Sequence, residues 1–174
     1  MSSELDKEHY LESIKAAFNK KETYRRFPTD NEFRTQFITK NVYNSKVRKY
    51  LFDKLENFER KETVDFENYT LEHIMPQNKN VSESWRRDLG ENWQIIHDKY
   101  LHTIDNLTLT GYNPELSDRP FLEKRNMEGG FADSPIRLNS SLVHLEHWNE
   151  DEIVKRANIL IDQSLQIWEF PSLP

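Results

Sequence analysis

Apolar residues recur at helical spacing in both terminal parts of the chain. The first 60 residues contain three such patterns, over residues 11–18, from a helix-start signal at residues 29–32, and over residues 44–59. The third pattern predicts one apolar helix face made of Val47, Tyr50, Leu51, Leu55 and Phe58. A fourth pattern begins near Asn149, where a run of acidic residues favours a helix N-terminus, and ends at Trp168.

The middle of the chain has a different hydrophobic pattern, with short β-prone segments. Residues 69–76 are short and β-prone and stop at Pro76, and residues 104–110 form a second β-prone run before a turn. Short helices are expected between them, over residues 82–100. We therefore expect a mainly helical α+β fold in one compact domain: residues 1–62 as a helical part with a basic face, residues 63–128 as the core, and residues 129–174 as helix packed on that core.

Composition excludes several classes of protein. A length of 174 residues suits one domain, and 12% aromatic residues indicate a packed core despite a mean hydropathy of −0.89. No apolar run approaches the roughly 20 residues that span a bilayer, and the start of the chain has no signal-peptide pattern. The absence of Cys excludes disulfides, Cys-ligated zinc and a Cys nucleophile. A cytoplasmic location is the default expectation.

Charge is distributed unevenly. The formal net charge of −6 argues mildly against a nucleic-acid binder. Residues 15–61, however, hold 13 Lys/Arg against 6 Asp/Glu, which suggests a basic face on an acidic body. On this interpretation Lys46, Arg48 and Lys49 contact the DNA backbone, in a salt-sensitive and sequence-independent way. The alternative is an ordinary solvated helical surface.

Polar residues at the ends of the two predicted strands suggest a catalytic site. Glu72 and His73 close the first strand, Asn106 begins the second, and Asn113 follows it. If these residues converge, Glu72 and Asn113 supply oxygen ligands for Mg²⁺, and His73 is left as a general base. Asn106 would then hold the loop that carries His73. This arrangement suits hydrolysis of a phosphodiester bond.

Each of these assignments has a structural alternative. Glu72 is instead salt-bridged to a basic residue, and Asn113 is instead a turn residue before a proline. Lys124 and Arg125 lie on the helix expected after the turn, where they either contact a phosphate or are ordinary surface charges.

The order of these motifs resembles the HNH (ββα-metal) nucleases. The strings at residues 72–76, 100–113 and 116–125 are similar to the nuclease domain at the C-terminus of GmrSD-type, modification-dependent restriction systems. The resemblance implies a ββα-metal element between helical flanks and a Mg²⁺- or Mn²⁺-dependent DNA endonuclease serving phage defence. It also implies His73 as catalytic base, Glu72 and Asn113 on the metal side, and Asn106 shaping the loop. His102 recurs in the pattern, which predicts packing near the site.

The resemblance also implies partners. In such systems the nuclease domain is joined or bound to a nucleotide-hydrolysing, DNA-sensing domain or subunit, and the substrate is modified phage DNA. The chain has no G-x-x-x-x-G-K-[ST] pattern, so we expect it not to hydrolyse nucleotides itself. Two alternatives stay open: a non-catalytic module that binds DNA or a partner, and an RNA-cleaving or toxin nuclease with the same site.

Overall fold

The structure is a computed structural model that describes residues 8–22, 26–65 and 67–171. The ends of the first and third predicted segments, residues 1–7 and 172–174, lie outside the described residues. The main elements follow one another in the order α1 (Tyr10–Asn19), α2 (Asp30–Thr39), α3 (Arg48–Asn57), β1 (Thr70–His73), α4 (Glu83–Leu89), α5 (Trp93–Tyr100), β2 (Leu107–Thr110), α6 (Asn113–Leu116), α7 (Phe121–Asn126) and α8 (Glu150–Ile167). Short 3₁₀ turns precede β2 and α8, at Ile104–Asn106 and Arg137–Leu142.

Local capping signals fix where several helices begin. Thr29 and Glu32 form a capping box at the start of α2, in which each side chain bonds the backbone N–H of the other residue. The side chain of Ser82 caps α4, and that of Asn149 accepts a hydrogen bond from the backbone N–H of Glu152 at the start of α8. The helix starts predicted at residues 29–32 and near Asn149 are confirmed.

Helix α3 is shorter than predicted and buries only part of the predicted apolar face. It begins at Arg48 rather than near residue 44, and Val47 and Tyr50 are 53% and 50% exposed. Its buried side chains are Phe52, Leu55 and Glu56. The prediction of an apolar face through Val47 and Tyr50 is therefore wrong. The carboxylate of Glu56 is buried because it accepts hydrogen bonds from the backbone of the turn at residues 137–138.

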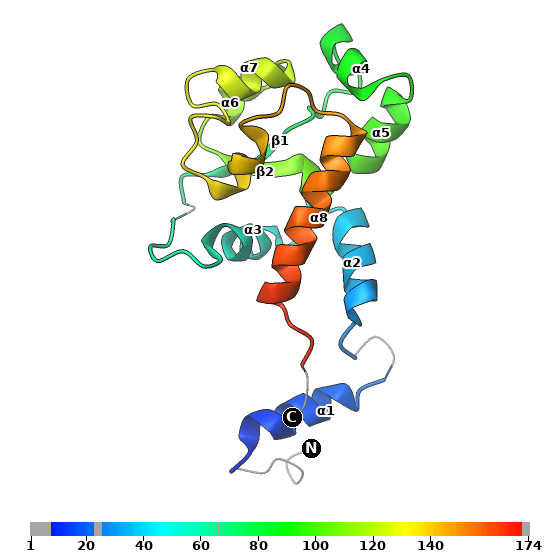
Figure 1. Cartoon of the computed structure of the whole chain (residues 1–174), viewed down its shortest axis with the longest axis vertical. Coiled ribbons are helices and arrows are strands. Elements are labelled where there is room, and N and C mark those ends of the chain that lie inside the picture. The colour runs from blue at the N-terminus through cyan, green and yellow to red at the C-terminus, as the bar shows by residue number, and fades with distance from the viewer. Residues whose placement is uncertain (1–7, 23–25, 66, 172–174) are drawn as a thin grey trace.

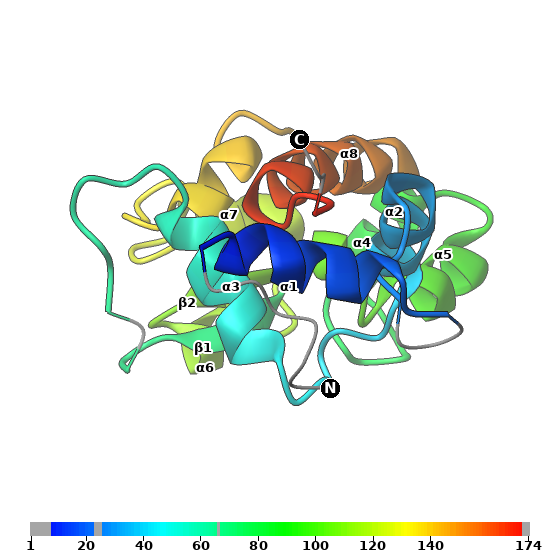
Figure 2. The same ribbon diagram turned by 90° about the horizontal axis from the view of Figure 1, so that it is seen from below.

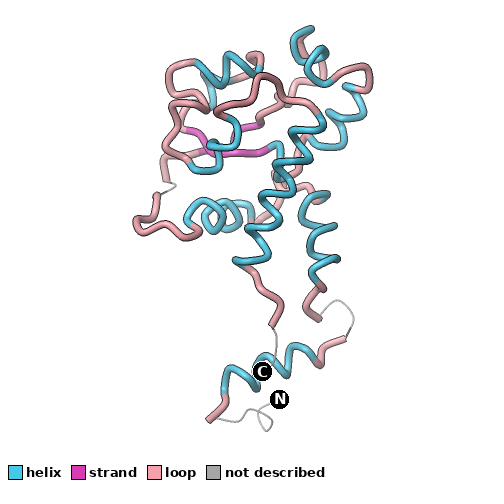
Figure 3. Tube along the Cα trace, viewed as in Figure 1, coloured by secondary structure: helices cyan, strands magenta, loops and turns pink. Residues whose placement is uncertain are grey.

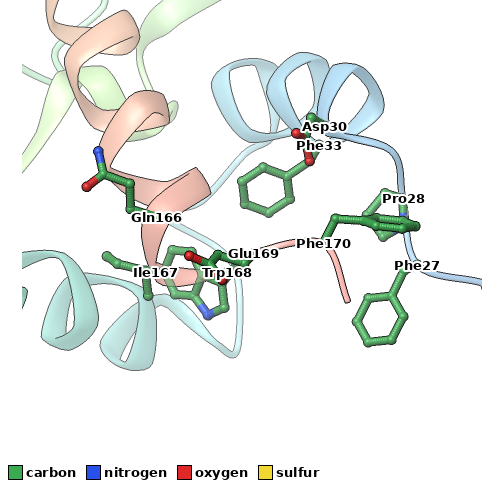
Figure 4. Close-up of a pocket in the computed structure, with 9 residues that line it drawn as sticks. All are labelled: Phe27, Pro28, Asp30, Phe33, Gln166, Ile167, Trp168, Glu169 and Phe170. Carbon is green, nitrogen blue, oxygen red and sulfur yellow. The ribbon is translucent and has the colours of Figure 1, made fainter. Parts of the chain in front are cut away.

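The two strands form an antiparallel ribbon. Its register pairs Thr70 with Thr110 and His73 with Leu107. The two strands are separated in sequence by α4 and α5, and β2 leads directly into α6 and α7. Figure 3 shows the ribbon surrounded by helices and loops.

Two apolar cores lie around the ribbon. One gathers beneath α4, α5 and α7 and includes Trp85, Phe121 and Trp148. The other gathers between α2, α3, β2 and the second half of α8 and includes Phe52, Leu107 and Leu160. Helix α8 runs through the centre of the molecule beside α2 and α3, while α6 and α7 lie across the ribbon from α3 (Figure 1). The ribbon is thus enclosed between two layers.

Helix α1 stands apart from both cores. It lies beyond the ends of α2 and α8, and the view from below shows it crossing in front of them (Figures 1 and 2). None of its side chains is buried. Its contacts include an edge-on packing of Phe18 against Phe27 and a hydrogen bond from Asn19 to the carbonyl of Pro171. It therefore contributes little to the packed body that positions the central residues.

The fold class predicted from the sequence is confirmed, since the chain is mainly helical with one small sheet. Among the described residues, no helix has the length and apolar character needed to cross a membrane.

Candidate active site

The ribbon decides which polar side chains meet. Successive residues of a strand point to opposite faces of the sheet. Glu72 and His73 are consecutive residues of β1, so the carboxylate of Glu72 and the imidazole of His73 lie on opposite faces of the ribbon. The expectation that Glu72 and His73 converge on one point is wrong, because both residues lie within the regular strand and not in the loop after it.

The first face carries His73 in contact with two other rings. His73 Nε2 lies 3.1 Å from His102 Nδ1, at hydrogen-bond distance. Tyr43 packs on both histidines, with its ring centroid 4.5 Å from that of His73 and 5.2 Å from that of His102. The ring of Tyr43 is nearly parallel to that of His102, at 11°. The three rings form a compact cluster, hereafter the His73–His102–Tyr43 cluster.

This cluster keeps His73 uncharged. Burial, followed by repulsion from the neighbouring His102, lowers the pKa of His73 to about 3. Burial likewise lowers the pKa of His102. At neutral pH the His73 imidazole is therefore neutral and has one nitrogen lone pair that can accept a proton, and the same shift of its pKa makes it a weaker base than a free imidazole.

A groove of about 670 Å³ lies on the same side of the ribbon and reaches the cluster at Tyr43. Asn113 stands on its wall, and its amide group donates a 2.6 Å hydrogen bond to the carbonyl of Leu71. Arg48 and Lys49, both exposed, stand on the α3 side. The rest of the lining is largely apolar and comprises Phe52, Glu67, Tyr69, Thr70, Leu71, Leu109, Gly111 and Pro114. The structure thus gathers a neutral histidine cluster, an amide and two cations on one side of the sheet.

Arg48 also supports the cluster. It donates a 2.6 Å hydrogen bond to the backbone carbonyl of Tyr43, and its guanidinium lies over the Tyr43 ring at 5.7 Å from the centroid. Lys46 is exposed in the turn before α3 and does not line the groove. Of the three basic residues predicted to face DNA, Arg48 and Lys49 border the groove directly.

The opposite face holds a buried ion pair. Lys124 Nζ lies 2.6 Å from Glu72 Oε1 and donates a second hydrogen bond, 2.8 Å long, to the carbonyl of His73. Lys124 is completely buried and Glu72 is 4% exposed. Burial raises the pKa of Glu72 and lowers that of Lys124, and the mutual attraction of the pair opposes both shifts. The salt-bridge alternative for Glu72 is the one that the structure contains.

Lys124 and Arg125 are not placed to receive a phosphate. The expectation for Lys124 is wrong, because its ammonium group is enclosed and already paired with Glu72. Arg125 donates hydrogen bonds to the carbonyl of Leu145 and to Glu146, and only 12% of its side chain is exposed. Two basic residues late in a short polar helix predict exposed surface charges. In the structure, both side chains instead bond to groups outside α7.

The oxygen donors Glu72 and Asn113 lie apart, on opposite faces of the ribbon, which bears on the divalent metal expected from the sequence. Mg²⁺ takes oxygen ligands, with carboxylates as the usual protein contribution. The Glu72 carboxylate is engaged by Lys124 on one face, whereas Asn113 lines the groove on the other. Across the described residues, no cluster of three or more His, Asp or Glu side chains is arranged to hold an ion. The arrangement does not fit a metal shared by Glu72 and Asn113.

Asn106 connects the ribbon to the residues after His73. It is fully buried, its Oδ1 accepts hydrogen bonds from the backbone of Met75 and from the Trp148 indole, and its amide group donates to the carbonyls of Met75 and Leu101. It has no bond to the imidazole of His73 and no access to the groove. Asn106 therefore fixes the backbone just after β1.

The sequence matches a known protein family over most of its length. Residues 27–163 match the family described as GmrSD restriction endonucleases, C-terminal domain. The chain belongs to this family. No curated protein matches the chain. The match places the chain among domains related to restriction endonucleases, which act on DNA, and it includes the His73–His102–Tyr43 cluster, Asn113 and α3.

The family match and the packed body of the structure have the same N-terminal limit. The GmrSD match begins at Phe27 and thus excludes α1, which the structure likewise sets apart. The sequence does not mark Tyr43 as a site residue, because nothing in its local pattern distinguishes it from other aromatic residues of a helical lead-in. His102 was expected only to pack near the site. Tyr43 and His102 are brought together by backbone hydrogen bonds between distant parts of the chain. The N–H groups of Val42 and Tyr43 donate to the carbonyl of His102.

Proposed function

We propose that this chain is an HNH-type DNA endonuclease domain of a phage-defence restriction system, with His73 as the general base. The observation that carries the proposal is the neutral His73, held in the three-ring cluster beside a groove bordered by Asn113, Arg48 and Lys49. Membership of the GmrSD restriction endonuclease C-terminal family supports it.

The chemistry follows from these side chains. A water molecule loses a proton to the lone pair of His73, its oxygen forms a bond to phosphorus, and the bond to the leaving sugar oxygen breaks as that oxygen takes a proton from solvent water. Arg48 and Lys49 bind the phosphodiester backbone and place it for in-line attack. The neutral amide of Asn113 borders the path of the strand without adding charge. The resemblance to HNH nucleases supports Mg²⁺ or Mn²⁺ as the cofactor of the reaction.

The proposed biological setting rests on the family. The substrate is DNA, in particular modified phage DNA, and the partner is a nucleotide-hydrolysing sensor domain or subunit of the same system. The reaction takes place in the cytoplasm. The alternative, a non-catalytic module that binds DNA or a partner, predicts binding without strand cleavage. Cleavage of plasmid DNA by the purified chain, with Mg²⁺ or Mn²⁺ and in EDTA, separates the two proposals.

Replacing Lys49 is expected to weaken DNA binding without affecting the chemistry. Lys49→Ala removes one cation from the groove, so the slope of log affinity against log salt concentration should become shallower by about 1. The loss should be similar for different DNA sequences, because a phosphate contact carries no sequence information. Fluorescence anisotropy of a labelled duplex at several salt concentrations measures this slope.

Lys155→Ala is the matched control for this experiment. Lys155 is an exposed lysine of α8 outside the groove lining, paired with Glu152. Its replacement should leave the salt dependence unchanged. Equal effects of the two substitutions would mean that the groove beside α3 is not the DNA-binding surface.

A further inference from the structure

The hydrogen bond between the two histidines restricts their protonation. A neutral imidazole has one N–H and one lone pair, so one of the facing nitrogens, His73 Nε2 or His102 Nδ1, donates and the other accepts. If His102 donates, the only lone pair of His73 is used, and His73 cannot take a proton from water. If His73 Nε2–H donates, the lone pair of His73 is at Nδ1 and is free.

The environment of His73 Nδ1 agrees with the second arrangement. In the described ranges, the buried side-chain nitrogen and oxygen atoms without a hydrogen-bond partner are the two carboxylate oxygens of Asp105. His73 Nδ1 has no protein partner in the described chain and is not among those buried atoms, so it contacts solvent although His73 as a whole is 4% exposed. A solvent-facing lone pair at Nδ1 is what a water-activating base needs.

His102 is held in place independently of His73. Its backbone carbonyl accepts hydrogen bonds from the N–H groups of Val42, at 2.9 Å, and Tyr43, at 3.3 Å. Its ring is stacked on the Tyr43 ring, which Arg48 anchors through the carbonyl of Tyr43. The position of His102 Nδ1 is therefore set by the segment before α3. A preset acceptor of this kind can select one tautomer of the neighbouring ring.

We propose that His102 is a positioning residue that accepts the Nε2–H of His73 and so holds the lone pair of His73 at Nδ1, where it is open to solvent. This inference rests on the proposed nuclease function, in which His73 is the base. His102 does not touch the reacting atoms. Its role is to fix the ring orientation and the tautomer of the residue that does.

Two substitutions of His102 separate the hydrogen bond from the ring stacking. His102→Phe keeps an aromatic ring against Tyr43 and removes Nδ1, whereas His102→Asn loses the ring and keeps a polar atom close to the Nδ1 position. We expect His102→Phe to lower kcat about 10- to 100-fold with KM within about twofold of the parent, the range found when a supporting hydrogen bond is removed. His102→Asn should restore most of that kcat. Equal kcat in parent and His102→Phe, or equal losses in both variants, would overturn the proposal.

A measurement that does not require cleavage tests the same inference. Nitrogen-15 NMR of the imidazoles at neutral pH distinguishes protonated from unprotonated ring nitrogens. In the parent chain His73 should be protonated at Nε2 and unprotonated at Nδ1, and in His102→Phe the two tautomers should mix. A proton on Nδ1 in the parent overturns the inference even if the enzyme is active. Failure of the parent to cleave DNA with either metal, both with and without the sensor subunit, contradicts the proposed function, while the NMR result still decides the role of His102.

Discussion

The His73→Ala variant is expected to lose between about 100-fold and 10,000-fold of the DNA cleavage rate, the usual contribution of a general base. The variant has no group in the three-ring cluster that can take a proton from water in the geometry of His73. His102 does not replace it, because its Nδ1 is directed at the position that the His73 ring occupies in the parent. The rate of conversion of supercoiled to nicked plasmid, under single-turnover conditions, measures this loss.

His144→Ala is the matched control, since His144 is exposed. It should cut at the parental rate. His73→Ala should also bind DNA with nearly parental affinity and unfold cooperatively, because the phosphate contacts proposed for Arg48 and Lys49 remain. A His73→Ala variant that is folded and cuts as fast as the parent would show that His73 is not the base.

The Lys124→Met variant is expected to lose about 3–5 kcal/mol of unfolding free energy, the usual result of removing one partner of a buried ion pair. The substitution leaves the Glu72 carboxylate enclosed without its cation, and it removes the hydrogen bond to the carbonyl of His73. The apolar methionine side chain fills much of the same space, so the loss is mainly electrostatic. Urea unfolding at neutral pH, followed by circular dichroism, measures the change.

Two further variants isolate the ion pair. Lys155→Met removes a lysine whose side chain is 67% exposed and paired with Glu152, and it should change stability by less than about 1 kcal/mol. Adding Glu72→Met to Lys124→Met should recover most of the lost stability, since the unpaired carboxylate is then gone. If the single Lys124→Met variant is as stable as the parent, the enclosed pair on this face is not an energetic feature of the fold.

The elements of this fold that depend on local signals could be predicted from the sequence. The capping box of Thr29 and Glu32, the Asn149 cap and the two short strands are each specified by residues a few positions apart, and each is present. The burial of Lys124 could not be predicted in this way. Its position late in a polar helix resembles a surface site, and its partner Glu72 lies 52 residues away in sequence.

The candidate site was predictable only in part. His73 and Asn113 were identified from their order along the chain, and the structure places both on the groove side of the ribbon. The sequence predicts a salt bridge of Glu72 only as an alternative to metal binding and does not identify Lys124 as its partner. Strand geometry directs the adjacent side chains of Glu72 and His73 to opposite faces, which their sequence neighbourhood does not reveal. Tyr43 and His102 come from different parts of the chain and meet only through tertiary packing. Tyr43, from the segment before α3, thus joins His73 of the ribbon in one candidate site.

The ion pair also bears on how a metal enters this site. A divalent ion that used Glu72 as a ligand would have to displace the Lys124 ammonium from a fully buried position. Removing a buried cation from its partner is costly. We therefore expect any divalent ion that supports cleavage to bind on the groove face, near Asn113, and not at Glu72.

The most direct test of this account is a cleavage time course on supercoiled plasmid DNA with the purified chain. Parallel reactions contain Mg²⁺, Mn²⁺ or EDTA, each with and without the cognate sensor subunit. The account predicts nicked and then linear DNA with at least one metal and none in EDTA. Supercoiled DNA that stays intact with both metals, in the presence as well as the absence of that subunit, would contradict the assignment of this domain as a nuclease.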